Sequence, residues 1–142
     1  MDIAIKLILW VHLMSLALAG SAAFGGPAVL ALMRAADASQ RTALAPVLAK
    51  LAALGRMALV LLVLTGVALI VTKLGGVSGL NPWFHTKMLL VVLMIALSVF
   101  GLMNAKKARS GDAAAAARMP MLSKVGMALL AGIVLCAVFA FN

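Results

Sequence analysis

Apolar residues are gathered into four long runs, and three shorter, more polar segments separate them. The runs cover about residues 3–33, 57–72, 82–104 and 122–141. Each is close to the roughly 20 residues that a helix needs to cross the hydrocarbon core of a bilayer. Backbone groups in lipid must pair within their own segment, and a membrane barrel would need more numerous, alternating segments. The runs are therefore predicted to be helices.

Two of the helices are expected to extend beyond their apolar runs. A helical lead-in from Ala43 lengthens the second, and the alanine tract behind Asp112 lengthens the fourth, with a break near Pro120. The pattern thus predicts one transmembrane domain, residues 1–142, with helices over about 3–33, 43–72, 82–104 and 113–141. The predicted fold class is all-α, an integral membrane four-helix bundle.

The basic residues lie mainly in the first and third connectors. Residues 34–56 contain four Lys or Arg and residues 105–124 contain five, whereas the glycine-rich middle connector, residues 73–81, contains one. Positive loops stay in the cytoplasm, so both termini and the middle connector, a predicted tight turn, should face the non-cytoplasmic side. Arg34 and Arg56 are expected to bracket the inner boundary of the bilayer.

Composition supports the same class and removes others. Hydrophobic residues make up 66% of the chain and charged residues 11%, which excludes a water-soluble globule and a disordered chain. The net charge of +9 could indicate a nucleic-acid partner, but the clustering of the cations between apolar runs favours membrane topology. We expect a multi-pass protein of the cell inner membrane whose surroundings are the lipid bilayer, with no nucleic-acid partner.

The apolar runs contain no carboxylate. All three acids, Asp2, Asp37 and Asp112, lie outside the runs, and the chain has no Glu. This excludes a paired-carboxylate acid/base site, a di-iron carboxylate bundle and an Asp-based proton relay. Phosphate-binding glycine loops and zinc-type cysteine pairs are also absent from the sequence. The single cysteine, Cys136, is expected to pack as a small apolar residue.

Two histidines carry the remaining chemistry. His12 lies in the first run, roughly 13 Å from its start, and His85 lies roughly 5 Å into the third. Both helices should begin on the outer side, so both imidazoles are predicted in the outer half of the bilayer. They could ligate haem together or with a methionine such as Met14 or Met88, bind a soft metal such as copper, or transfer protons. The plain alternative is a hydrogen bond within the bundle for His12 and an interfacial position for His85.

Three residues near the outer boundary add to this picture. Lys87 follows His85 by two residues and is the candidate catalytic residue. It could extend to the interface, or pair with an anionic group such as a porphyrin carboxylate. Trp10 and Trp83 are typical interfacial anchors, and stacking on a flat ligand is the second interpretation.

Three features of the sequence form a recognisable pattern. They are His12, a proline fifteen residues later (Pro27), and the stretch Trp83-Phe84-His85-Thr86-Lys87 at the start of the third helix. The pattern resembles the HemJ-type protoporphyrinogen oxidases and, more loosely, the small bundles around the copper-resistance membrane protein CopD. The resemblance implies a four-helix inner-membrane protein associated with haem b, which oxidises protoporphyrinogen IX. It implies His12 and His85 as the cofactor-binding and metal-ligating residues.

Two functions are carried forward from the sequence. The first is a haem b-binding protein with a tetrapyrrole or redox role. The second is a non-enzymatic subunit of a larger membrane complex or homo-oligomer, in which small-residue stripes such as Ala17, Ser21 and Gly25 form the contact faces. Whether the chain is an enzyme is left open between them.

Overall fold

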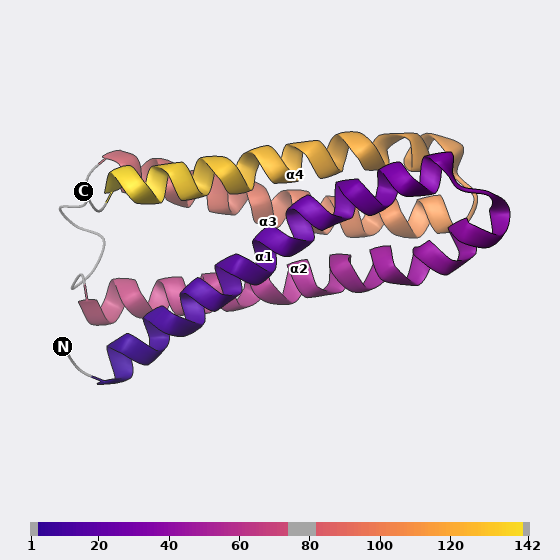
Figure 1. The fold of residues 1–142 in the computed structure, drawn as a ribbon. Helices are drawn as coiled ribbons and strands as arrows, with labels where there is room; N and C mark the ends of the chain where they lie inside the picture. The colour runs from indigo at the N-terminus through magenta and orange to yellow at the C-terminus, as the bar shows by residue number, and fades with distance from the viewer. Residues whose placement is uncertain (1–2, 74–81, 141–142) are drawn as a thin grey trace. The chain divides into compact units, whose positions relative to one another are not determined.

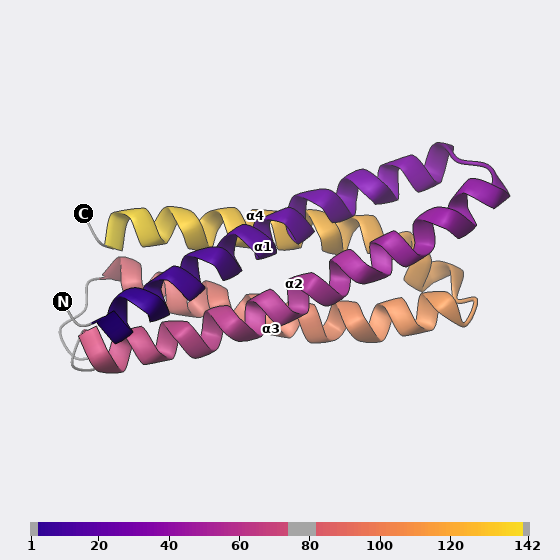
Figure 2. The same ribbon diagram turned by 60° about the horizontal axis from the view of Figure 1, so that its bottom comes forward.

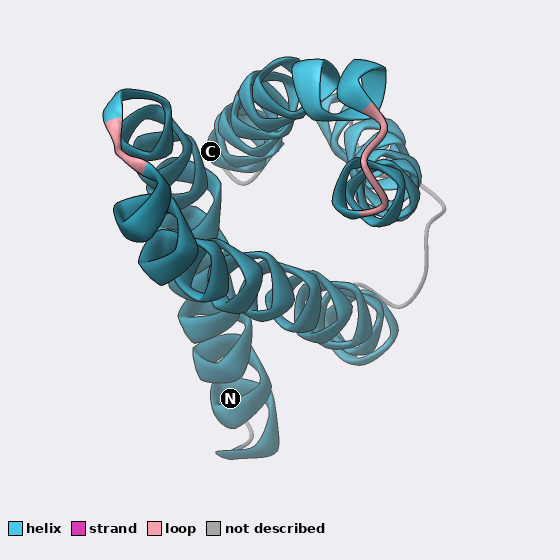
Figure 3. Ribbon diagram, turned by 90° about the vertical axis from the view of Figure 1, so that its right-hand side faces the viewer, coloured by secondary structure: helices cyan, strands magenta, loops and turns pink. Residues whose placement is uncertain are grey.

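The protein, seen in a computed structural model that describes residues 3–73 and 82–140, is built from four α-helices. These are α1 (Ile3–Ala35), α2 (Ala38–Lys73), α3 (Pro82–Arg109) and α4 (Ala113–Ala140), shown in Figure 1. Within the described ranges there is no strand, and only short loops join α1 to α2 and α3 to α4 (Figure 3). The all-α prediction is confirmed. Most of the middle connector, predicted as a tight turn, lies at 74–81, outside the described residues.

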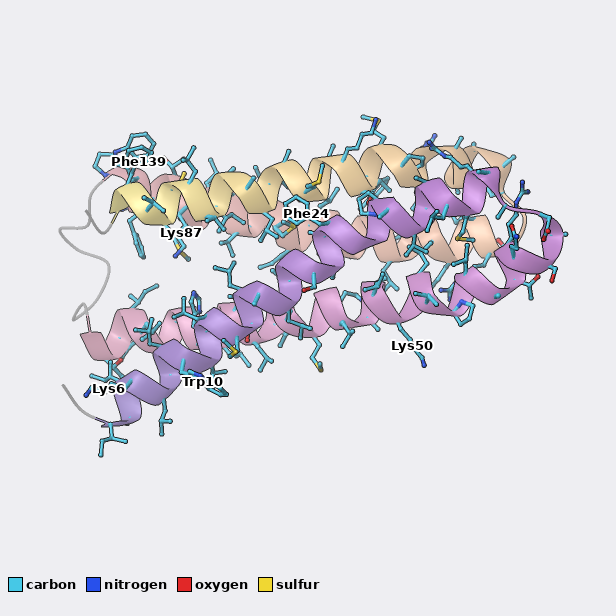
Figure 4. All side chains as sticks on the ribbon, in the orientation of Figure 1. Lys6, Trp10, Phe24, Lys50, Lys87 and Phe139 are labelled. Carbon is cyan, nitrogen blue, oxygen red and sulfur yellow. The ribbon has the colours of Figure 1, made fainter. Side chains whose placement is uncertain are left out.

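All four helices are long and apolar enough to cross a membrane. Large apolar side chains remain exposed along them (Figure 4), among them Leu7, Val60, Leu64, Leu89 and Leu135, each more than half exposed. Such extensive apolar exposure is unfavourable in water and favourable in lipid. The chain is therefore a multi-pass membrane protein.

The second helix begins earlier than the predicted residue 43 because its start is capped. Asp37 precedes α2, and its Oδ1 accepts a hydrogen bond of 2.8 Å from the backbone N–H of Gln40. The Gln40 side chain in turn accepts one of 3.3 Å from the backbone N–H of Asp37. This reciprocal capping box satisfies backbone donors that a helix start leaves open, so the helix extends to the turn.

The third and fourth helices also meet across a short turn. Gly111, with a φ of +97°, reverses the chain after α3, a conformation that suits glycine. Asp112 then caps α4 by accepting a 3.0 Å hydrogen bond from the N–H of Ala115. The expected break near Pro120 is wrong, because α4 is one helix from Ala113 to Ala140. Proline costs a helix one internal hydrogen bond without necessarily ending it.

The chain divides into two compact units, one containing α1 and α2 and the other α3 and α4. In the first unit the two helices run antiparallel and side by side (Figures 1 and 2). Glycines set their spacing. A Cβ built on Gly55 of α2 would lie only 3.0 Å from the Cβ of Ala22, and one on Gly25 of α1 would lie 3.5 Å from Leu51. Small residues thus let the two backbones approach closely.

This register also fixes the levels of two arginines within the first hairpin. Arg56 follows Gly55 and therefore lies at about the level of Ala22, not at the level of Arg34. The helical rise over the twelve steps from Ala22 to Arg34 separates the two levels by about 18 Å. The expected role of both arginines at the inner boundary of the bilayer stays a prediction.

The second unit is packed in a similar way. Cβ atoms built on Gly126 and Gly132 of α4 would lie 3.6 Å from Leu97 and 3.3 Å from Leu90 of α3. Near the turn, the buried side chain of Asn104 donates a 2.8 Å hydrogen bond to the carbonyl of Ala115. A buried amide needs such a partner, and here it joins α3 to the first turns of α4.

Replacing Gly55 by leucine should separate α1 from α2. The new side chain meets the Ala22 Cβ, which is fixed to a helix and cannot move aside, so overpacking should cost about 1–3 kcal/mol of unfolding free energy. Denaturant titration in mild detergent measures the loss. Gly20→Leu is the matched control, because nothing lies within 4 Å of a Cβ at Gly20. Equal stabilities for the two variants would contradict the close approach.

Candidate functional site

His12 lies on α1 within a long apolar stretch and is partly buried. Its Nδ1 is 2.8 Å from Oγ1 of Thr65 on α2, at hydrogen-bonding distance. The neighbouring residue, Gly66, also borders the ring, since a Cβ built there would lie 3.6 Å from Cε1 of His12. The imidazole is thus held in place by two consecutive residues of the adjacent helix.

Thr65 has a second hydrogen bond, within its own helix. Its Oγ1 lies 2.6 Å from the carbonyl oxygen of Leu61, one turn earlier, and 3.4 Å from that of Leu62. Hydroxyl side chains in helices commonly donate to the preceding turn in this way. The result is a short polar chain from imidazole to hydroxyl to backbone carbonyl inside an apolar helix pair.

His85 has a different setting near the start of α3. Its side chain is exposed, and its ring makes an edge-to-face contact with the buried Phe84, with centroids 6.2 Å apart and planes at 88°. Next to it, Trp83 stacks on Phe139 of α4 at a centroid distance of 5.1 Å. The sequence predicts Trp83 as an interfacial anchor or as a stacking surface for a ligand. In the structure it stacks on Phe139, a side chain of its own hairpin.

Lys87, the predicted catalytic residue, is partly buried two residues beyond His85. Cys136 lies on α4, three residues before Phe139, and is buried. Figure 4 shows Lys87 and Phe139 at the same end of the α3–α4 hairpin. The second hairpin therefore gathers an imidazole, an amine, a thiol and an aromatic stack near one end.

The predicted site residues fall in both hairpins. His12 meets Thr65 and Gly66 in the first. His85 and Lys87 lie two residues apart on α3 in the second, a spacing at which the side chains of a helix do not face each other. Among the described residues, no group of three or more His, Cys, Asp or Glu could hold a metal ion.

Thr65 is the residue that sequence reasoning missed. It is a hydroxyl residue near the middle of the apolar part of α2, and a polar group at that depth needs a hydrogen-bond partner. That signal was available. The pairing with His12 was not, because it depends on the register between α1 and α2.

The chain was also compared with known proteins. No family model, curated protein or solved structure matches it. The case for a function therefore depends on the chemistry of these residues, and above all on the imidazole of His12.

Proposed function

We propose that this protein is a haem b-binding protein of the inner membrane, and that His12 and His85, each within its own hairpin, are the candidate residues to hold the haem. One observation supports the proposal most strongly: the His12 imidazole is fixed by Thr65 inside an apolar helix pair, with Nδ1 and Oγ1 2.8 Å apart. A histidine in a membrane helix is costly unless it has a use, and ligating histidines are typically oriented through their second nitrogen.

The residues fit the group in three respects. Haem needs one or two axial ligands and no cluster of acids, which agrees with the absence of carboxylates from the apolar runs. Apolar side chains surround His12 along α1, as a porphyrin ring requires. Lys87 follows His85 on α3 and offers a cation for a porphyrin carboxylate.

Bound haem would supply one-electron chemistry, whose potential depends on the ligands and on burial. The chain's own contribution is binding and orientation. His12 offers a ring nitrogen in a water-poor environment, Lys87 neutralises negative charge, and the apolar helix faces exclude water. This supports a tetrapyrrole or redox role, in line with the resemblance of His12, Pro27 and the His85 stretch to HemJ-type proteins.

The orientation in the membrane is part of the proposal. Both hairpin turns are rich in basic residues. Arg34 and Arg41 flank the first turn, and Lys106, Lys107 and Arg109 end α3 at the second. Lys50 also points outward from α2 in the turn-side half of its hairpin (Figure 4). The positive-inside rule then puts both turns in the cytoplasm and both termini on the outer side.

The alternative of an accessory subunit gains no specific support. Its contact faces were expected to be small-residue stripes. The glycines that approach another helix closely do so within their own hairpin, as Gly25 does with Leu51 and Gly132 with Leu90. Those positions are already used for packing the fold.

Purified protein should show a Soret band, either as isolated or after addition of haem. His12→Ala should reduce the bound haem more than tenfold, because the residue that would hold the iron is lost. His85→Ala should remove or shift the band. Ser15→Ala is the matched control: this buried hydroxyl, three residues from His12, bonds only to the Val11 carbonyl among the contacts seen here, and its loss should leave the spectrum unchanged. Absence of a Soret band after haem addition would refute the proposal.

The orientation can be tested by cysteine labelling in a Cys136→Ala background. Ser110→Cys, at the exposed turn after α3, should react with a membrane-impermeant maleimide in inverted vesicles but not in spheroplasts. Ile3→Cys, at the exposed start of α1, should show the opposite result. Three helices separate the two positions, so labelling of both from one side would contradict three crossings between them, and the reversed pattern would contradict the proposed orientation.

A further inference from the structure

The hydrogen bond between His12 and Thr65 also determines which ring nitrogen carries the proton. A neutral imidazole has one N–H and one lone pair. A partner that can only accept, or only donate, at one nitrogen favours one of the two arrangements. Nδ1 of His12 faces Oγ1 of Thr65 at 2.8 Å. The question is therefore whether the Thr65 hydroxyl accepts a proton from the ring or donates one to it.

The hydroxyl proton of Thr65 is already donated in another hydrogen bond. Oγ1 lies 2.6 Å from the Leu61 carbonyl oxygen, and two oxygens this close require a hydrogen between them. A carbonyl cannot donate, so the hydroxyl must. Other hydroxyls in these helices do the same: Thr72 donates to Ala68 at 2.7 Å and Thr86 to Pro82 at 3.0 Å.

We infer that His12 is held as the Nδ1–H tautomer, which donates to Thr65, so that Nε2 carries the lone pair and is the atom that would ligate the haem iron. Thr65 is then a positioning residue, and the Leu61 carbonyl fixes Thr65 in turn. The assignment of Nε2 to iron rests on the proposed function, whereas the assignment of the proton does not.

The surroundings of the ring agree with a fixed orientation. Gly66 follows Thr65, and the space beside it is filled by Cε1 of His12 at ordinary van der Waals distance, 3.6 Å from a Cβ built there. Rotation of the ring about the Cβ–Cγ bond would break the hydrogen bond at Nδ1 and would also lose this packing contact. The hydrogen bond and the contact therefore select one orientation.

A ligating histidine that donates its other N–H is a stronger and better oriented ligand. Loss of such a partner typically costs 10- to 100-fold in affinity for the metal group. Thr65→Val keeps the size and branching of the side chain and removes the acceptor. Thr65→Ser restores the hydroxyl and should therefore restore the behaviour of the wild-type protein.

The proton can be located by ¹⁵N NMR of the full chain, labelled at histidine, purified in mild detergent from cells grown without added haem precursor. His85→Gln identifies the His12 signals. In the wild type and in Thr65→Ser, Nδ1 should have a pyrrole-type shift and Nε2 a pyridine-type shift. In Thr65→Val the equilibrium should move toward Nε2–H. A protonated Nε2 in the wild type, or no change in Thr65→Val, would overturn the inference.

Haem titration of the same proteins provides the second readout. Thr65→Val should bind haem 10- to 100-fold more weakly than the wild type and Thr65→Ser, with a more positive reduction potential, because the imidazole donates less electron density. If the NMR result is as expected but the wild type binds no haem, the proposed function fails and the proton assignment stands. If the wild type binds haem and Thr65→Val matches it, Thr65 is not a positioning residue.

Discussion

The structure depends on one constraint: a polar group inside an apolar helix must find its hydrogen-bond partner within the protein, because lipid offers none. Side-chain hydroxyls meet it within their own helix, as Ser15 does with the Val11 carbonyl. Asn104 and His12 meet it differently. Each bonds to the other helix of its hairpin, Asn104 to the Ala115 carbonyl and His12 to Thr65. The polar groups therefore join helices at defined positions, while the apolar contacts fill the space between.

The helices themselves could be predicted from the sequence, because hydrophobic length is a local property and the bilayer sets its scale. The starts of α2 and α4 needed finer local chemistry. Asp37 and Gln40 form a capping box, and their spacing is visible in the sequence. The surrounding segment is rich in basic residues, however, and was therefore interpreted as a connector. The rule that proline interrupts a helix failed at Pro120, since α4 continues through this residue.

Register between helices was beyond sequence reasoning. All four helices are apolar on most of their surface, so the period of hydrophobicity does not mark the face that meets a neighbour. Small residues mark it instead, and the chain has many of them. The contact between Gly55 and Ala22 sets the level of Arg56, and by the same register the partner of His12 is Thr65. His12, His85 and Lys87 could be chosen from residue type alone, whereas the residue that orients His12 could not.

The two histidines are not equivalent, because their surroundings within their own hairpins differ. Thr65 lies midway along the apolar part of α2, so the His12–Thr65 pair is far from water at either end. At that depth a hydrogen bond has little competition, and an imidazole keeps its orientation and its tautomer. His85 is exposed near the start of α3, where water and headgroups can exchange with it. If haem binds at His12 as proposed, its properties should therefore depend on the first hairpin, through a threonine that holds the imidazole without touching the haem.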